Sequence, residues 1–301
     1  MSLPAQVKIV EVGARDGLQN EKNDNLTLAL REELIRRLAA TGLTAIEVGS
    51  FVSPKWVPQM ADTDQLLGSL GDLTVQKPVL VPNQKGLDAA LAAGAQEIAI
   101  FGAASEGFSQ KNINMSVAES LDKFGHIAQQ AIDQGSRVRG YVSTVIACPY
   151  DGPTHPEQVL TVAKAMLDMG CYEISLGDTI GVGTPATVTL LLDVLHGALP
   201  MDKLAVHFHD TYGQALANIL VALQQGVSVV DSSVAGLGGC PYAKGATGNV
   251  ATEDVVYMLE GMGIKHGVDL PALAATGDWI SDQLQRQNQS RAGVALNRRA
   301  Q

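Results

Sequence analysis

A short phrase recurs along the chain and constrains its fold more than any other feature of the sequence. In each copy, a segment with helical spacing of apolar residues ends at a glycine, and a β-branched residue follows four positions later. A glycine there is typical of a left-handed helix cap, and the short offset is typical of a tight connection into the next strand. The copies are Gly42 with Ile46, Gly94 with Ile98, Gly170 with Ile174 and Gly226 with Val230. Such repeats favour one sheet built from strand–helix units over two unrelated domains.

Apolar, β-rich runs alternate with helical patterns along the chain, and eight of these runs have the length of strands. They are 8–13, 45–51, 77–81, 97–102, 137–143, 172–177, 204–209 and 229–234. Alternating strands and helices imply a parallel sheet, and eight units fit a closed (β/α)8 barrel, which takes about 250 residues. The 301 residues are therefore predicted to form one α/β domain, a TIM barrel over about 7–268 with an extra C-terminal helical extension over about 269–301.

Two helix starts can be read directly from capping residues. Ser116 with Glu119 fits a capping box, in which each side chain bonds the backbone of the other residue. Thr184 and Pro185 fit the N-cap and the first position of a helix, where proline loses no backbone hydrogen bond. We therefore expect helices to begin at both places.

Composition excludes several classes of partner and compartment. The net charge of −10 argues against nucleic acid and against an anionic membrane surface. The three cysteines, an odd number without Cys-x-x-Cys spacing, argue against a disulfide scaffold or a structural zinc site and suit a reducing compartment. The first eight residues show no signal pattern, and no apolar run is long enough to span a bilayer. The sequence therefore predicts a cytoplasmic protein.

The strand that begins at Leu204 ends in two histidines. Residues two apart in a strand point to the same face, so His207 and His209 project side by side and can bind one metal ion. A bare His-x-His favours the alternative of two unrelated histidines in a buried strand. The pair lies, however, where an apolar strand runs into a polar loop, and ligands of α/β folds bind at that edge. Its position therefore favours a metal site.

Carboxylates follow other strands of the predicted barrel, where the catalytic residues of such barrels lie. Asp16 follows the first strand, Glu47 lies in the second and Asp178 follows the sixth. Each alone is better explained as a helix cap or a surface charge, but their joint position at strand exits favours a site. A carboxylate with two imidazoles, completed by solvent or substrate oxygens, suits Mg²⁺ or Mn²⁺ better than zinc.

A glycine-rich loop, Gly236-Leu237-Gly238-Gly239-Cys240, follows the eighth strand. It could cradle a phosphate, open a helix, or act as a flexible flap over the site. A lone cysteine usually behaves as a small buried apolar residue. Cys240 lies in a glycine-rich loop that is expected to be exposed, which makes that role less fitting for it. Asn249 lies further along the chain, at the start of the last predicted barrel helix. It could cap that helix or supply an oxygen to the metal.

The segment 181–186 matches the G-x-G-x-x-A fingerprint of dinucleotide-binding folds. Pro185 removes a backbone N–H that a pyrophosphate would need, and the motif lies in the sixth unit rather than the first. We therefore do not expect a dinucleotide site.

Four segments together resemble a known family. They read RDGLQNE at 15–21, IEV around Glu47, HFHD at 207–210 and SVAGLGGCPY at 233–242. In them the chain is similar to 3-hydroxy-3-methylglutaryl-CoA lyase, which belongs to the metal-dependent lyases and Claisen-type synthases built on a TIM barrel. The resemblance covers about 7–282. The glycine-loop string is specific for the lyase, whereas the Arg-Asp and His-x-His pieces are shared with isopropylmalate and homocitrate synthases.

The resemblance implies roles for individual residues. The implied ligands of Mg²⁺ or Mn²⁺ are Asp16, His207, His209 and Asn249. Outside this set, Arg15 would bind substrate by facing the thioester carbonyl, and Cys240 would be the reactive residue on a mobile loop. Glu47 and Asp178 would lie in the pocket.

The implied activity is cleavage of 3-hydroxy-3-methylglutaryl-CoA to acetyl-CoA and acetoacetate. Arg15 could stabilise the enolate oxygen, Asp178 or His207 could remove the hydroxyl proton, and Cys240 could protonate the enolate carbon. The alternatives are a lyase for a longer-chain 3-hydroxyglutaryl-CoA, a Claisen-type acyl-CoA synthase, and a non-catalytic barrel that only binds acyl-CoA. The resemblance also favours a homo-oligomer, in particular a dimer.

Two departures from the family pattern bear on this reading. Phe208 should point away from its histidine neighbours and leave the metal site intact, whereas Val48 and Gly49 could alter the acyl pocket. Lys111 and Asn112, after the fourth strand, are weak candidates for contact with CoA.

Overall fold

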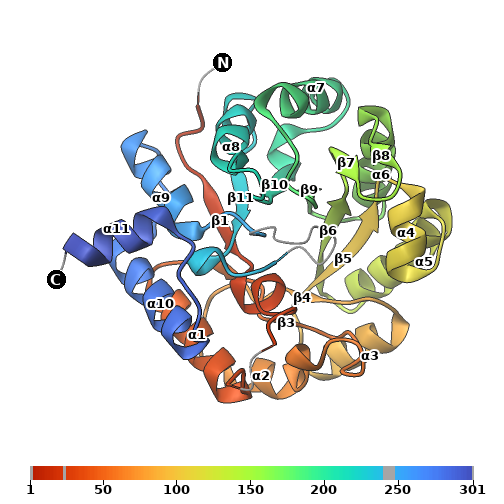
Figure 1. Cartoon of the computed structure of the whole chain (residues 1–301). Helices are drawn as coiled ribbons and strands as arrows, with labels where there is room; N and C mark the ends of the chain where they lie inside the picture. Colours follow the sequence, from red (N-terminus) through yellow and green to blue (C-terminus); the bar gives the residue numbers. More distant parts are fainter. Residues whose placement is uncertain (1–2, 23–24, 240–247, 300–301) are drawn as a thin grey trace.

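The computed structural model describes residues 3–22, 25–239 and 248–299. A parallel sheet forms the centre, and helices surround it (Figure 1). Its strands are β1 (Lys8–Glu11), β2 (Ala45–Ile46), β3 (Gly49–Ser50), β4 (Val79–Leu80), β5 (Glu97–Ala103), β6 (Arg137–Ser143), β9 (Glu173–Asp178), β10 (Leu204–Phe208) and β11 (Val229–Ser232).

The sheet closes because the second predicted strand bonds to both of its neighbours. The strand order runs β2-β1-β11-β10-β9-β6-β5-β4-β3, so β2 and β3 are at opposite ends of the sheet although only two residues separate them in the chain. Glu47 N donates to Glu11 O on one side, and Val48 N donates to Pro78 O on the other. All eight predicted strands are present, and the prediction of a TIM barrel is confirmed.

The helices form the outer ring of the barrel (Figure 1). They are α1 (Leu28–Ala40), α2 (Thr63–Ser69), α3 (Gln84–Ala92), α4 (Glu106–Ile113), α5 (Val117–Asp133), α6 (Pro156–Asp168), α7 (Pro185–His196), α8 (Ala215–Gln224), α9 (Thr252–Gly261), α10 (Leu270–Gln283) and α11 (Arg291–Arg299). The last two follow the barrel in sequence, and α10 packs against α1 and α11. Within the described residues, none of the helices combines the length and the apolar character needed to cross a membrane.

Three local features differ from the sequence prediction. The first strand ends at Glu11, and Gly13–Gly17 forms a π-helical turn in its place. The second strand is divided at residues 47–48. A short antiparallel hairpin, β7 (Ala147–Cys148) with β8 (Gly152–Pro153), was not predicted. Strands of two residues are too short to show a periodic pattern, so the sequence gives no signal for them.

The predicted helix ends are confirmed. The four repeated glycines all have positive φ, at 93°, 78°, 94° and 96° in chain order. The β-branched residue four positions after each is fully buried. Ser116 and Glu119 form the capping box, with Glu119 N donating to Ser116 Oγ at 3.2 Å. Thr184 caps α7, and Pro185 is its first residue.

Two of the repeated glycines form a matched pair for a stability test. An added Cβ at Gly42 would lie 2.3 Å from the carbonyl oxygen of Gly267, whereas a Cβ at Gly94 would meet no atom within 4 Å. Left-handed backbone costs a non-glycine residue about 1–2 kcal/mol. We therefore expect Gly94→Ala to lower the free energy of unfolding by about that amount, and Gly42→Ala to lower it clearly more. Urea unfolding of both variants tests this, and equal losses would contradict it.

Side chains alternate between two layers on the barrel. Those facing outward form the main apolar core with the helices. Those facing inward include a small apolar cluster of Val10, Val12, Ala45, Ala205 and Val229. Further along the axis the interior becomes ionic, because β6 and β9 contribute a buried arginine and glutamate. This charged interior was not predicted from the sequence.

Candidate active site

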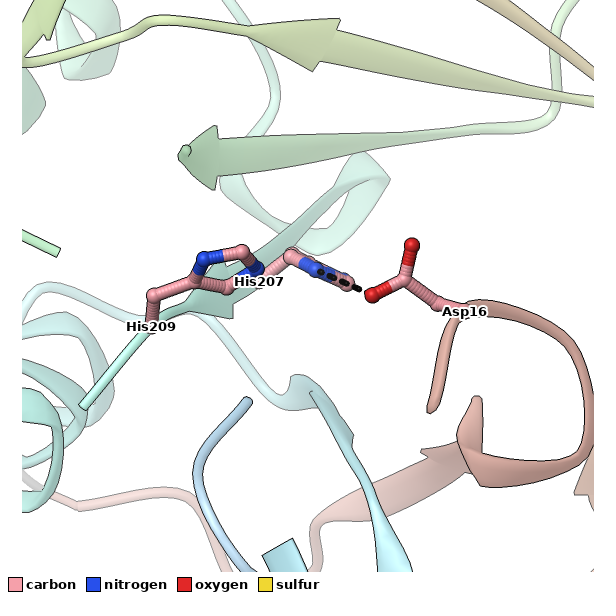
Figure 2. A group of neighbouring side chains, drawn as sticks. All are labelled: Asp16, His207 and His209. Atoms are coloured by element: carbon pink, nitrogen blue, oxygen red, sulfur yellow. Dashed lines mark ion pairs between the residues drawn. The ribbon is translucent and has the colours of Figure 1, made fainter. Parts of the chain in front are cut away.

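Three of the predicted metal ligands meet at one end of the barrel. Asp16 lies on the π-helical turn after β1, His207 in β10 and His209 directly after β10. One ligand atom from each residue lies within 4.8 Å of the other two, and the dashed line in Figure 2 joins His207 to Asp16. His207 Nε2 is 3.9 Å from Asp16 Oδ2, and the two imidazole centroids are 5.4 Å apart. Residues almost 200 positions apart in sequence are therefore neighbours, as expected for a shared ligand set.

Asn249, the fourth predicted ligand, lies against this cluster. Its Nδ2 donates to Asp16 Oδ2 at 2.8 Å and to Leu237 O at 3.2 Å. Its backbone forms an isolated antiparallel bridge with His209. The alternative in which Asn249 caps the following helix is wrong, because α9 begins at Thr252 after Ala251.

The electrostatics of Asp16 and His209 favour the protonation states that bind a cation. Burial raises the pKa of Asp16, but the Arg15 guanidinium and the two imidazoles outweigh it and hold that pKa at about 2. Burial and the neighbouring His207 lower the pKa of His209 to about 4. Burial disfavours a charged His207, yet a hydrogen bond from its ring to Asp231 and the charge of Asp16 raise its pKa. At neutral pH, Asp16 is therefore an anion and His209 a neutral imidazole.

The residues present fit a divalent cation. Nδ1 of His209 is buried and makes no well-aligned hydrogen bond within the described residues, although the backbone of Thr179 approaches the ring and favours its protonated form. One carboxylate, two imidazoles and a nearby amide form a mixed oxygen and nitrogen set that suits Mg²⁺ or Mn²⁺.

Arg15 and Glu47 lie beside the cluster as an ion pair. Arg15 Nε donates to Glu47 Oε2 at 2.7 Å, and Arg15 Nη1 donates to Asp16 Oδ1 at 2.8 Å. The Tyr141 ring lies 5.6 Å from Arg15 Cζ. Glu47 is fully buried where the second strand divides, and its other oxygen, Oε1, is without a partner in the described part of the chain. Glu47 and Asp16 therefore fix the Arg15 guanidinium through Nε and Nη1.

Asp178 does not join these residues. Its carboxylate accepts from Gly183 N at 2.7 Å and from Val182 N at 3.3 Å. It lies two residues after Leu176, which packs in the outer core, so it belongs to the helix-facing side of β9. The glycine motif at 181–183 therefore donates backbone amides to the Asp178 carboxylate.

The two departures from the family pattern face the helices. Phe208 is buried in the outer core and points away from the cluster, as predicted. Val48 also packs in the outer core, and a Cβ built at Gly49 would meet Thr63 and Arg31. The expectation that Val48 and Gly49 shape the acyl pocket is therefore wrong, because neither faces the barrel interior.

Two buried acids that support the site, Glu11 and Asp231, were not predicted from the sequence. Glu11 Oε1 accepts from Gly13 N at 2.7 Å and from Val234 N at 2.9 Å, so it joins the loops after β1 and β11. Burial raises its pKa to about 7. Asp231 lies behind His207, with Oδ2 at 3.3 Å from His207 Nδ1. An acid within an otherwise apolar strand was the available signal in both cases.

The glycine loop is only partly described. Its stem, the 3-10 turn Val234–Gly236, contains Ala235 with φ of 55°, and Ala235 N donates to the Glu253 carboxylate at 3.0 Å. Cys240 lies outside the described residues.

In comparisons with known proteins, the chain matches one family model, and the relatives and solved structure described here carry the name of one enzyme. The HMGL-like family profile matches residues 6–280. The mitochondrial hydroxymethylglutaryl-CoA lyase of Arabidopsis thaliana is 59% identical over 298 residues, which are 99% of this chain and 64% of that longer protein. The mitochondrial lyase of Gallus gallus is 56% identical over 99% of this chain and 100% of its own. A crystal structure of hydroxymethylglutaryl-CoA lyase from Pseudomonas aeruginosa superposes with a TM-score of 0.96 at 53% identity, covering 99% and 100% of the two chains.

Proposed function

Because the chain belongs to the HMGL-like family, we propose that it is a carbon–carbon lyase dependent on a divalent metal ion. Its substrate is 3-hydroxy-3-methylglutaryl-CoA, and its products are acetyl-CoA and acetoacetate. The observation that carries the proposal is the convergence of Asp16, His207 and His209 beside Arg15. The lyase names of relatives that are more than half identical to the chain support the substrate.

The metal ligands we propose are Asp16, His207, His209 and Asn249, with Mg²⁺ or Mn²⁺ as the ion. A divalent ion bound there would acidify the hydroxyl group of the substrate and orient it. Its ligands come from the π-helical turn after β1, from the end of β10 and the residue after it, and from the segment before α9, so the barrel itself sets their geometry.

Arg15 stabilises the negative charge that develops on the thioester oxygen when the carbon–carbon bond breaks. A fixed donor is effective in this role because it needs no reorganisation during the reaction. Glu47 and Asp16 hold the guanidinium through Nε and Nη1. No hydrogen bond of Nη2 is found within the described residues, which leaves that nitrogen for substrate. Glu47 thus acts by positioning Arg15.

Two proton transfers complete the reaction. Of the two candidate bases for the hydroxyl proton, His207 lies in the cluster, whereas both oxygens of Asp178 accept backbone hydrogen bonds. Of the two, only His207 lies beside the proposed metal site, and because its Nδ1 faces Asp231 it can accept the proton only while Nε2 is not bound to the metal. Asp178 orders the loop after β9. Cys240 is proposed to protonate the enolate carbon, and support for this role comes from the resemblance of the glycine loop.

One assay tests the proposed function. Purified protein is incubated with 3-hydroxy-3-methylglutaryl-CoA and Mg²⁺ or Mn²⁺, with and without EDTA, and acetoacetate is measured. We expect release of acetoacetate that EDTA abolishes and that added metal restores. Cleavage only of homologues with a longer acyl chain would support the first alternative, and condensation without cleavage would support a synthase. Binding without turnover would indicate a non-catalytic barrel.

We also propose a homodimer in the cytoplasm. The resemblance supports the dimer, and light scattering of the purified protein tests it. Cys148 and Cys171 are buried free thiols, which suits a reducing compartment, although the names of the two relatives above place those proteins in mitochondria. Cell fractionation tests the compartment.

A further inference from the structure

A buried ion-pair network reaches the back of the candidate metal site. Arg139 of β6 is fully buried and donates from both terminal nitrogens to Asp231 of β11, at 2.7 Å to Oδ1 and at 3.0 Å to Oδ2. The same Oδ2 accepts from Ser175 Oγ at 2.8 Å and lies 3.3 Å from His207 Nδ1. Asp231 therefore links the arginine to one of the two imidazoles.

The strand register explains why these side chains meet. Paired residues in neighbouring parallel strands point to the same face of a sheet. His207 pairs with Asp231 in β11, and Tyr141 of β6 pairs with Ser175 of β9. Their side chains therefore all enter the barrel interior, in adjoining layers of the barrel.

Glu173 and Lys8 extend the network along the barrel axis, and its positive and negative charges are equal in number. Arg139 Nε donates to Glu173 Oε1 at 2.7 Å, and Lys8 Nζ donates to Glu173 Oε2 at 2.9 Å. Two cations thus face two carboxylates in Lys8, Arg139, Glu173 and Asp231. Breaking a buried ion pair is costly because one charge is left without a partner, so Arg139 holds Asp231 in place as a carboxylate.

The two imidazoles of the site are supported differently. His207 has the Asp231 carboxylate behind Nδ1, and its Nε2 faces Asp16. His209 Nδ1 has no well-aligned hydrogen bond within the described residues. A carboxylate accepts hydrogen bonds and cannot donate them, so it requires the proton of a neutral His207 to be on Nδ1. That tautomer leaves the lone pair of Nε2 directed toward Asp16.

From this geometry we propose that Asp231, held by Arg139, is a positioning residue that fixes the tautomer and the ring orientation of His207 for metal binding. The proposal rests on the metal site proposed above. Partners of this kind act through the ligand, and their loss typically weakens metal binding about 10- to 100-fold.

The test compares Asp231→Asn with Ser175→Ala in the intact chain. Free Mn²⁺ is titrated with each protein and followed by electron paramagnetic resonance. We expect Asp231→Asn to weaken Mn²⁺ binding about 10- to 100-fold. Ser175→Ala removes another bond to the same Oδ2 but leaves Arg139 and His207 in contact with Asp231, so it should bind Mn²⁺ nearly as the wild type does.

A second measurement is made on the wild type and so does not depend on the folding of Asp231→Asn. Nitrogen-15 spectra of the metal-free wild type, recorded where the ring of His207 is neutral, report which nitrogen carries the proton, and a His207→Gln spectrum identifies the signal. We expect the proton on Nδ1. A proton on Nε2, or equal Mn²⁺ affinities of folded Asp231→Asn and wild type, would overturn the proposal. Wild-type protein that binds no Mn²⁺ would instead overturn the metal site itself.

Discussion

Replacing Arg15 with methionine is expected to lower kcat for acetoacetate release about 100- to 1,000-fold, the usual cost of losing one fixed donor to a developing oxyanion. The guanidinium adjoins the metal cluster through Asp16 and is held on its other side by Glu47. Arg15→Lys keeps the charge but loses the fixed planar fork, so its kcat should fall between those of the wild type and Arg15→Met. Steady-state kinetics with saturating Mn²⁺ give kcat and KM for each variant.

Two controls separate catalysis from stability. Arg37→Met removes an exposed arginine of α1 that pairs with Glu33, and its kcat should equal that of the wild type. Arg15→Met leaves Glu47 buried without its cation, so thermal unfolding is measured, and Glu47→Gln is added to relieve the unpaired charge. If kcat stays normal and only KM rises, Arg15 binds the substrate and the transition state equally well. It then does not stabilise the transition state selectively, and the proposed role is contradicted.

Replacing His209 with alanine is expected to abolish metal-dependent turnover while the barrel remains folded. The variant removes one of the two imidazoles, and the remaining Asp16, His207 and Asn249 should hold the ion too weakly to support turnover. The fold should tolerate the change, because Nδ1 of His209 makes no well-aligned hydrogen bond within the described residues and its loss leaves few buried groups without a partner. Acetoacetate release and Mn²⁺ titration measure the two effects, and circular dichroism checks the fold.

A matched control for this variant lies on the outer ring. His196, in the last turn of α7, is exposed, so His196→Ala should keep both turnover and Mn²⁺ affinity. A folded His209→Ala with unchanged turnover would show that this imidazole is not a required ligand, and the metal assignment would then be withdrawn.

The sequence predicted the elements of the fold because their signals are local. Each helix-ending glycine and the β-branched residue after it report on a few consecutive residues, and all four such pairs have the expected conformation and burial. The pairing of His207 with His209 on one face also follows from strand geometry alone, and their position at a strand exit placed them at the end of the barrel where Asp16 lies.

Side-chain direction at each strand exit was harder to predict. Asp178 ends a strand as expected, but it lies on the helix-facing side and binds the loop amides of Val182 and Gly183. A shift of one residue moves a side chain to the other face, and sequence places strand ends only within a few residues. The sequence therefore identified Asp178 as a strand-end acid without deciding which face it occupies.

What the sequence by itself determined is the barrel, its repeated helix ends and the three residues that form the candidate metal cluster. Only the tertiary structure decided what lies behind that cluster, where Arg139, Asp231 and Ser175 come from three strands that meet through the register of the closed sheet. The physical reason is that a buried charge is stable only beside its partner, and the partners here are separated by up to 92 positions along the chain. No local pattern records such a pair, because it exists only once the barrel has closed.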